Sequence, residues 1–327
     1  MIDDELTQPD LEAQVAAQAR ADDILRPAGA LARLDELAVW VAGWQANARP
    51  RIDRPAALVF AGDHGVVAEG VTAYPAEVTA SMLAAFEQQV ATISALGRAA
   101  GVEVRAVDVG VGLPTGNLAA EPALDEDRLR SAMTQGGEAV AELADDGADL
   151  VALGEMGIGN TTAAAAICTT LLDGGAADWV GRGAGVDDDG LARKQAVVDR
   201  AVARLGDDTD PLRVLAELGG TELAAIAGAT LEARRRALPV VLDGYICTAA
   251  VLPLHQARPG VLDHCRAGHR SAEPGHGRLL AAIGMEPILE LDLRLGEGSG
   301  AVAAVPLIRM ACAALSEVPT FSEWFGE

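Results

Sequence analysis

Short apolar runs alternate along this sequence with longer alanine-rich segments, and no other feature constrains the fold as strongly. The runs have the length of buried strands, and the segments between them are prone to form helices. Strands that alternate with helices build a parallel sheet with helices on both faces. We therefore expect an α/β fold with strands near residues 56–61, 102–109, 149–153, 238–242 and 287–293.

The N-terminal part of the chain has a different pattern. Apolar residues in 9–47 recur at loosely helical spacings, which predicts a helical segment before the first strand. No fixed repeat and no long linker divides the sequence. Its 327 residues fit one large α/β domain or two interleaved ones.

Acidic residues outnumber basic ones by 48 to 25, which gives a formal net charge of −23. Such a surface repels phosphate backbones and anionic headgroups, so we expect neither nucleic acid nor a membrane as a partner. The start of the chain, MIDDE, lacks the basic and apolar regions of a signal peptide, and a cytoplasmic location is expected. The four cysteines have no paired spacing, which argues against a disulfide framework or a structural zinc site.

Glycine and acidic residues follow each expected strand. The carboxyl ends of parallel strands share one edge of a sheet, and ligands bind at that edge in open α/β sheets. Glycine in a turn and aspartate as a helix cap explain any single ending, but five endings at one edge predict a site. They are Gly62–Gly65, Asp108–Gly110, Gly154–Gly157, Asp243–Gly244 and Gly296–Gly298.

The segment 154–162, GEMGIGNTT, has the residues of a phosphate site. Its glycines let a ligand approach the backbone, and the helix that follows begins with free N–H groups that favour an anion. The segment is neither a Walker A motif nor a clean dinucleotide fingerprint, so nucleoside triphosphates and NAD are not indicated. Tight packing of a strand against a helix is the alternative explanation.

Lys194 is the only lysine of the chain; the other 24 basic residues are arginines. It follows a glycine-rich segment, 181–190, that ends in three carboxylates, Asp187–Asp189. These carboxylates either bind Mg²⁺ or cap a helix, and we favour the cap. Lys194 then lies about one turn into that helix, within reach of a phosphate on the neighbouring loop.

Residues 269–276 contain two histidines and a glutamate. The Pro274–Gly275 step prevents the single helical face that a metal-binding histidine pair requires, so hydrogen bonding to a ligand or a turn is favoured over a metal site. His64 has the same two explanations, a structural one and a functional one.

Glu297 is the best candidate for a general base. It stands between Gly296 and Gly298, after what we expect to be an inner strand. The glycines leave the carboxylate unshielded, and partial burial raises the pKa of such a group toward the range useful for proton removal. A surface glutamate in a flexible turn is the alternative, but no Ser-His-Asp or Cys-His arrangement competes.

Together these segments closely resemble the nicotinate mononucleotide:dimethylbenzimidazole phosphoribosyltransferase family, from Phe60 to about Leu315. The resemblance implies a Rossmann-like parallel sheet flanked by helices, a homodimer, and a smaller helical domain in which residues 1–50 and 306–327 join beside an α/β catalytic domain of 51–305. The motifs that carry it are AGDHGV at 61–66, AYPAEVTA at 73–80, VDVGV at 107–111, AMT at 132–134, GEMGIGNTTAAAA at 154–166, LDGYI at 242–246, GHRSAEPGH at 268–276 and RLGEGSGA at 294–301.

The resemblance also implies roles for individual residues. Glu297 matches the family's general base, while Tyr74, Met82 and Leu295 fall where the family lines its benzimidazole pocket. No cofactor and no metal is implied. The positions that match contacts to the nucleotide and its phosphate are Glu155, Gly157, Gly159, Asn160, Thr161, Lys194, Asp243, Gly244 and Ser271.

The implied reaction transfers the phosphoribosyl group of nicotinate mononucleotide to 5,6-dimethylbenzimidazole, giving α-ribazole 5′-phosphate and nicotinate for cobalamin synthesis. The alternatives are a non-catalytic nucleotide- or base-binding homologue, a transferase for another base, and a transferase that uses pyrophosphorylated ribose with Mg²⁺. Two departures from the family pattern are expected to border the acceptor base or the dimer contact. They are Gln88–Gln89, where relatives have two glycines, and the stretch 117–131.

Overall fold

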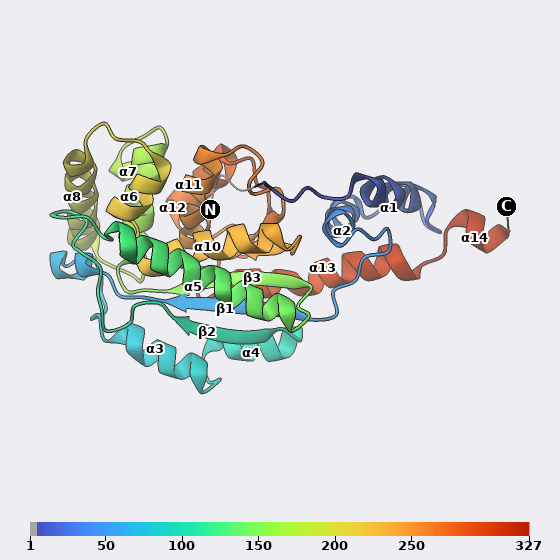
Figure 1. Cartoon of the computed structure of the whole chain (residues 1–327), viewed down its shortest axis with the longest axis horizontal. Coiled ribbons are helices and arrows are strands. Elements are labelled where there is room, and N and C mark those ends of the chain that lie inside the picture. Colours follow the sequence, from blue (N-terminus) through green and yellow to red (C-terminus); the bar gives the residue numbers. More distant parts are fainter. Residues whose placement is uncertain (1–4, 327) are drawn as a thin grey trace.

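The computed structural model describes residues 5–326 and contains a six-stranded sheet with helices on both faces (Figure 1). All neighbouring strands are parallel, in the order β2-β1-β3-β4-β5-β6, and the expected α/β fold is confirmed. The strands are β1 Pro55–Ala61, β2 Glu103–Asp108, β3 Leu150–Met156, β4 Val240–Leu242, β5 Cys265–His269 and β6 Pro287–Leu289.

The sequence did not predict β5, because its residues, CRAGH, form no apolar run. The strand depends on tertiary contacts: an added Cβ on Gly268 would lie 2.6 Å from the Cα of Ala301, so only glycine lets the helix Ser299–Glu317 pack this closely. The expected position of the last strand is also corrected. Strand β6 lies at the edge of the sheet and is not an inner strand.

Helices connect the strands and extend the chain at both ends. The expected N-terminal helical segment consists of two helices, separated by a turn that contains Pro27 and Gly29. The helices are α1 Leu11–Asp23, α2 Ala32–Gln45, η1 Gly65–Glu69, α3 Val78–Glu87, α4 Thr92–Ala100, α5 Glu126–Asp145, α6 Asn160–Leu171, α7 Ala176–Trp179, α8 Asp188–Leu205, α9 Pro211–Leu218, α10 Thr221–Arg235, α11 Tyr245–Ala257, α12 Pro274–Ala282, α13 Ser299–Glu317 and α14 Phe321–Phe325.

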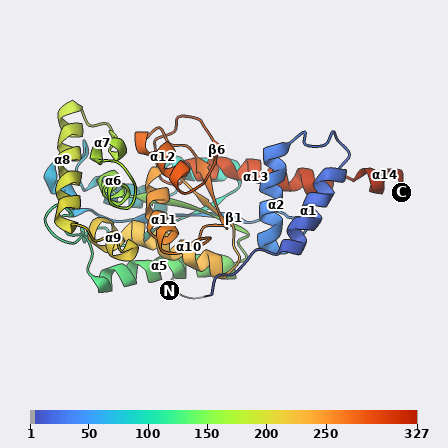
Figure 2. The same ribbon diagram turned by 90° about the horizontal axis from the view of Figure 1, so that it is seen from above.

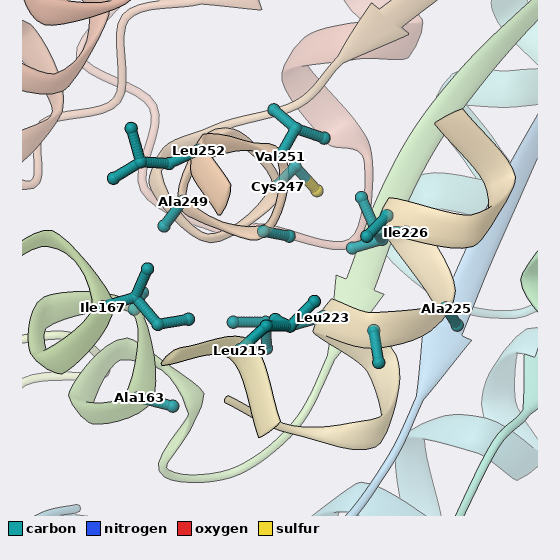
Figure 3. Close-up of a cluster of buried hydrophobic side chains, with 14 of the residues drawn as sticks. Ala163, Ile167, Leu215, Leu223, Ala225, Ile226, Cys247, Ala249, Val251 and Leu252 are labelled. Atoms are coloured by element: carbon teal, nitrogen blue, oxygen red, sulfur yellow. The ribbon is translucent and has the colours of Figure 1, made fainter. Parts of the chain in front are cut away.

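Two hydrophobic cores lie on opposite faces of the sheet. Along β1, Leu58 and Phe60 belong to one core and Ala57 and Val59 to the other, because successive side chains of a strand point to opposite faces. The first core contains the residues that α6, α9, α10 and α11 bring together (Figure 3). The second contains residues of α2, α4 and α13. Burial on both faces explains why β1, β3 and β4 are largely apolar without alternation.

Helix α13 joins the sheet to the helices at the chain ends. In both views it runs from the sheet towards α1, α2 and α14 (Figures 1 and 2), and it contacts β3, β4 and β5 as well as α1 and α2. By length and composition alone α13 could cross a membrane, but 61% of its apolar window is buried inside the protein, as in a core helix. The predicted domain boundary at 305/306 falls within this unbroken helix, and the domain division stays a prediction.

Helices α5 and α10 approach each other closely through glycine. A Cβ added to Gly136 would overlap the carbonyl oxygen of Ala225, and one added to Gly228 would overlap that of Met133. Gly137, the next residue of α5, has its nearest neighbour at 3.6 Å, an ordinary contact distance. Helix packing therefore requires glycine at position 136 but leaves room for a larger side chain at position 137.

We expect Gly136→Ala to lower the free energy of unfolding by about 2–4 kcal/mol, because the methyl group forces two packed helices apart. Gly137→Ala should instead raise it by up to about 1 kcal/mol, because alanine is the better helix former and has room there. Urea denaturation of both variants measures the two effects. Equal destabilisation by the two substitutions would contradict this account of the α5–α10 contact.

Candidate active site

A cavity of about 740 Å³ lies at the carboxyl edge of the sheet, which is the size of a small-molecule site. Two of the five strand endings, Gly62–Gly65 and Asp108–Gly110, do not line it. Every residue to which the family resemblance gives a role does line it. These residues are Tyr74, Met82, Glu155, Gly157, Gly159, Asn160, Thr161, Lys194, Asp243, Gly244, Ser271, Leu295 and Glu297. The individual roles assigned to them remain predictions, which the geometry below makes specific.

Lys194 is fully buried and reaches the cavity from α8. Its Nζ donates hydrogen bonds to Thr161 Oγ1 at 2.6 Å and to the carbonyl oxygen of Gly181 at 3.1 Å. Burial lowers the pKa of the Lys194 ammonium to about 8, and the nearby Glu273 opposes this decrease. An ammonium with this little water around it gains strongly from a phosphate or another anion.

The N-terminus of α6 faces the same part of the cavity. Its cap residue is Gly159, with φ of 99°, and no side chain caps the helix. The N–H groups of Asn160 and Thr162 donate to the carbonyl oxygens of Gly157 and Gly159, so the helix attracts an anion mainly through the positive end of its dipole. The preceding glycine-rich turn thus has the predicted form. The predicted cap of α8 is confirmed as well, because Asp187 accepts a hydrogen bond from the N–H of Gly190. Asp188 forms an ion pair with Arg182.

Glu155 ends β3 inside the cavity and is 5% exposed. Its carboxylate accepts a hydrogen bond from the side-chain amide of Asn160. Burial, together with the charges of Asp243 and Glu222, raises the pKa of the Glu155 carboxyl to about 8. At neutral pH Glu155 therefore holds a proton for most of the time, and can both donate and accept hydrogen bonds.

Glu297 lies in the turn before α13, between Gly296 and Gly298, and is 6% exposed. All three residues have positive φ, of 82°, 64° and 85°, an arrangement that costs free energy at the glutamate because its Cβ is crowded there. Its Oε2 has no hydrogen-bond partner among the described residues. Burial raises the pKa of the Glu297 carboxyl, and the charge of Asp243 acts in the same direction.

Asp243 holds that turn in place. Its Oδ1 accepts hydrogen bonds from the N–H groups of Gly300 and Ala301 at 2.7 and 3.0 Å. Its Oδ2 accepts one from the N–H of Gly298 at 3.2 Å. The carboxylate thus caps α13 from the end of β4 and fixes the residue next to Glu297. Asp243 lines the cavity, as predicted, and in addition supports the backbone of the candidate base.

The segment 269–276 forms hydrogen bonds within the protein. Burial lowers the pKa of His276 to about 3, so its ring is neutral. Its Nδ1 accepts a hydrogen bond from the N–H of Ser271 at 2.9 Å, and its Nε2 then donates to Thr248 Oγ1 at 3.1 Å. Thr248 in turn donates to the carbonyl oxygen of Gly244. The interpretation as a hydrogen-bonded turn fits this chain, which holds two cavity residues.

Apolar side chains make up much of the rest of the cavity lining. Tyr74 and Leu295 are about half exposed, and Met82 of α3 lies with them in the lining. This composition suits a flat, apolar ring. The sequence analysis missed several residues of this part because single apolar residues in loops carry no recognisable pattern. They are Val71, Val78, Met156, Ile158, Ile246 and Leu293.

The two departures from the family pattern lie outside the cavity. Neither Gln88–Gln89 nor the stretch 117–131 lines it, so of the two expected locations only the dimer contact stays a prediction. Gln89 instead has φ of 57°, and its side chain ties the end of α3 to the carbonyl oxygen of Val104 in β2. Arg182 lines the cavity and was not assigned to it, although its position in the glycine-rich segment before Lys194 was a usable signal.

Comparisons with known sequences point to one family. A family model described as phosphoribosyltransferase matches residues 6–324. A nicotinate-nucleotide–dimethylbenzimidazole phosphoribosyltransferase of Cereibacter sphaeroides is 48% identical over 98% of this chain and 94% of its own length. The protein of the same name from Ruegeria pomeroyi is 49% identical over 96% of this chain and 92% of its own.

Solved structures give the same result. A crystal structure of CobT from Thermus thermophilus superposes with a TM-score of 0.92 and 45% identity, over 96% of this chain and 98% of that one. A crystal structure of nicotinate-nucleotide–dimethylbenzimidazole phosphoribosyltransferase from the same organism gives a TM-score of 0.91 and 43% identity, over 97% and 99%.

The raised pKa of Glu155 predicts a pH-dependent loss of stability. Between pH 4.5 and about 8 the folded state keeps a proton that the unfolded state releases, so the contribution of Glu155 to the free energy of unfolding falls as pH rises. Glu155→Gln, which cannot ionise, should gain a few kcal/mol relative to the unmodified protein between pH 5 and pH 8. Urea denaturation at several pH values measures this gain. A difference that stays constant with pH would show that Glu155 is not titrating in this range.

Proposed function

Because the chain belongs to the nicotinate-nucleotide–dimethylbenzimidazole phosphoribosyltransferase family, we propose that its cavity transfers the phosphoribosyl group of nicotinate mononucleotide to 5,6-dimethylbenzimidazole. The enzyme is a pentosyltransferase of cobalamin biosynthesis, and its products are α-ribazole 5′-phosphate and nicotinate. One observation carries the proposal: a single cavity contains a buried ammonium, on Lys194, and a buried carboxylate oxygen without a partner among the described residues, on Glu297. The transfer needs both groups, one for the phosphate and one for the proton.

The donor binds through its phosphate. Lys194 supplies positive charge and a hydrogen-bond donor, and the positive end of the α6 dipole acts in the same direction. Thr161 already accepts a hydrogen bond from Lys194. Glu155, Asp243, Gly244 and Ser271 line the cavity for the rest of the nucleotide. Fixing the donor at its phosphate holds C1′ of the ribose at a set position for attack.

Charge explains why the leaving group needs no help. The nitrogen of nicotinate that bonds C1′ is quaternary in the donor, so departure neutralises it and requires no proton. The acceptor base is different, since its attacking nitrogen would become positively charged. One nitrogen attacks C1′ from the face opposite nicotinate, while the other loses its proton to Glu297, and the configuration at C1′ inverts from β to α.

The position of Glu297 suits this role. Burial in the turn before α13 raises the pKa of its carboxyl, which makes it a stronger base than an exposed glutamate, and Oε2 is free to accept the proton. Tyr74, Met82 and Leu295 would hold the apolar ring of the base. We further propose that the enzyme is a homodimer located in the cytoplasm, and that residues 1–50 and 306–327 form a smaller domain.

We expect purified protein to convert nicotinate mononucleotide and dimethylbenzimidazole into equal amounts of nicotinate and a ribazole phosphate, with chelator present. Glu297→Gln should bind the donor almost normally and lose roughly 100- to 10,000-fold in kcat, because only proton removal is affected. Chromatography with mass detection follows both products, and calorimetric titration measures donor binding.

Glu290→Gln is the matched control, since this glutamate is exposed and forms an ion pair with Arg270 outside the cavity lining. It should leave turnover unchanged. Turnover of Glu297→Gln equal to the unmodified enzyme would eliminate Glu297 as the base. Donor retained without any product would favour a different acceptor base or a non-catalytic binding protein, and activity lost with chelator would favour the Mg²⁺-dependent transferase.

Lys194→Ala should weaken binding of nicotinate mononucleotide roughly 10- to 100-fold at pH 7, because a charge-assisted hydrogen bond to phosphate is lost. The pKa of Lys194 near 8 adds a pH signature: the ammonium is charged below pH 8 and loses its charge above it. Donor affinity of the unmodified enzyme should therefore decline between pH 7 and 9, and this decline should be smaller in Lys194→Ala. Calorimetric titration at each pH provides the measurement.

Arg193→Ala removes the same charge from the neighbouring residue. The Arg193 guanidinium donates to the carbonyl oxygen of Gly70 and does not line the cavity, so this control should bind the donor normally. If both variants lose affinity for the donor equally, the loss is due to the change in net charge, and Lys194 does not bind the phosphate directly.

A further inference from the structure

A histidine and a glutamate lie fully buried under the glycine-rich loop of the cavity. His64 follows β1, and Glu222 is in the first turn of α10. His64 Nε2 and Glu222 Oε1 are 2.5 Å apart, and both side chains are 0% exposed. Neither residue lines the cavity. The pair therefore cannot touch a bound substrate, and any effect on the reaction must pass through the residues above it.

Glycines surround this pair on several sides. A Cβ on Gly157 would lie 2.8 Å from Glu222 Oε1 and 3.2 Å from His64 Cδ2. A Cβ on Gly220 would lie 2.6 Å from Glu222 Oε2 and 2.9 Å from His64 Nε2. Real Cβ atoms almost never come within 3.0 Å of a neighbour. The backbone of the loop thus rests directly on the pair, with no side chain between them.

The loop that rests on the pair is part of the cavity wall. Gly157, Gly159, Asn160 and Thr161 line the cavity, and Thr161 accepts the hydrogen bond of Lys194. A Cβ on Gly159 would lie 3.5 Å from His64 Cβ, so His64 packs against the loop as far as Gly159, the cap residue of α6. A shift of the imidazole would therefore move the start of α6 and Thr161, the hydrogen-bond partner of Lys194.

The pair has a rigid base on its other side. Leu223, the residue after Glu222, lies in the buried cluster that joins α10 to α6 and α9 (Figure 3). The α10 backbone fixes the position of the Glu222 carboxylate, which is hydrogen-bonded to His64. Glu222 and His64 together support the backbone of the Gly157–Thr161 loop. The charge of Glu222 also contributes to the raised pKa of Glu155 at the end of β3.

Stability alone does not account for this arrangement. His64 Nδ1 and Glu222 Oε2 are buried and have no hydrogen-bond partner among the described residues. A buried polar pair with one hydrogen bond and two unsatisfied atoms is unfavourable compared with an apolar pair of the same volume. Groups of this kind are retained where function requires them.

We propose that His64 and Glu222 are a positioning pair, which holds the Gly157–Thr161 loop in the shape that receives the phosphate of the donor. The inference rests on the proposed function, and it adds two residues to the site that do not contact the substrate. Loss of the hydrogen bond loosens the loop and weakens donor binding. Binding of the acceptor base, which the apolar part of the cavity provides, remains unaffected.

The test compares two amides at one position. His64→Gln places an amide nitrogen near the position of Nε2 and keeps the hydrogen bond to Glu222, whereas His64→Asn is one methylene shorter and cannot reach it. We expect H64N to weaken binding of nicotinate mononucleotide at least 10-fold, with KM for the base unchanged, and H64Q to stay within about 3-fold of the unmodified enzyme. Hydrogen exchange of residues 157–161 should be faster in H64N alone.

His264→Asn controls for the loss of any buried histidine. His264 is also 0% exposed, and its Nε2 forms a hydrogen bond with the carbonyl oxygen of Thr230. It immediately precedes β5 and so lies at the amino ends of the strands, away from the cavity at their carboxyl ends. This variant should lose stability and bind the donor normally. If H64N does not fold, Glu222→Asp draws the carboxylate away from His64 and gives the same comparison.

Two results would overturn the inference: unchanged donor affinity and exchange in the folded H64N variant, or equal weakening by H64Q and H64N. Failure of the proposed function is seen separately, as an unmodified protein that forms no nicotinate. Hydrogen exchange of the loop still tests the positioning pair in that case, because it does not depend on turnover.

Discussion

The carboxylate of Asp243 accepts three hydrogen bonds from the N-terminus of α13, and much of the molecule depends on this contact. It joins the end of the central strand β4 to the helix that crosses one face of the sheet. It also sets the turn in which Glu297 has positive φ. Since α13 continues to α1 and α2, the same contact relates the terminal helices to the cavity (Figure 2).

Buried charge is the second constraint on this site. Lys194, Glu155 and Glu297 are all nearly inaccessible to water, and burial shifts the pKa of each toward its neutral form. Each shift costs stability in the empty protein, and the same desolvation strengthens contacts to a phosphate or a proton. Two large apolar cores offset that cost, and they also keep the strand ends in fixed positions.

Much of the fold and of the candidate site could be predicted because their signals are local in the sequence. Apolar runs identified β1 to β4 and β6. Glycine with acidic residues marked the ends of β3 and β4 and the turn before α13, which line the cavity, but also the ends of β1 and β2, which do not. Strand β5 was not predicted, because it has no apolar run and its Gly268 is required only by the close packing of α13 in the folded chain. The pair of His64 and Glu222 was not predicted either, since its members are distant in sequence and meet only in the folded chain.

The sequence by itself determined the class of fold, the edge of the sheet where the site lies and the residue types available there. These can be predicted because they depend on the spacing of apolar residues and on the chemistry of individual side chains, both of which are local in the sequence. Only the tertiary structure decided which groups are buried, which atoms lack partners and how close the glycine backbones approach. These properties depend on residues from β1, α10 and α13 that lie far apart in sequence. The raised pKa of Glu155 and the support under the loop arise from that packing.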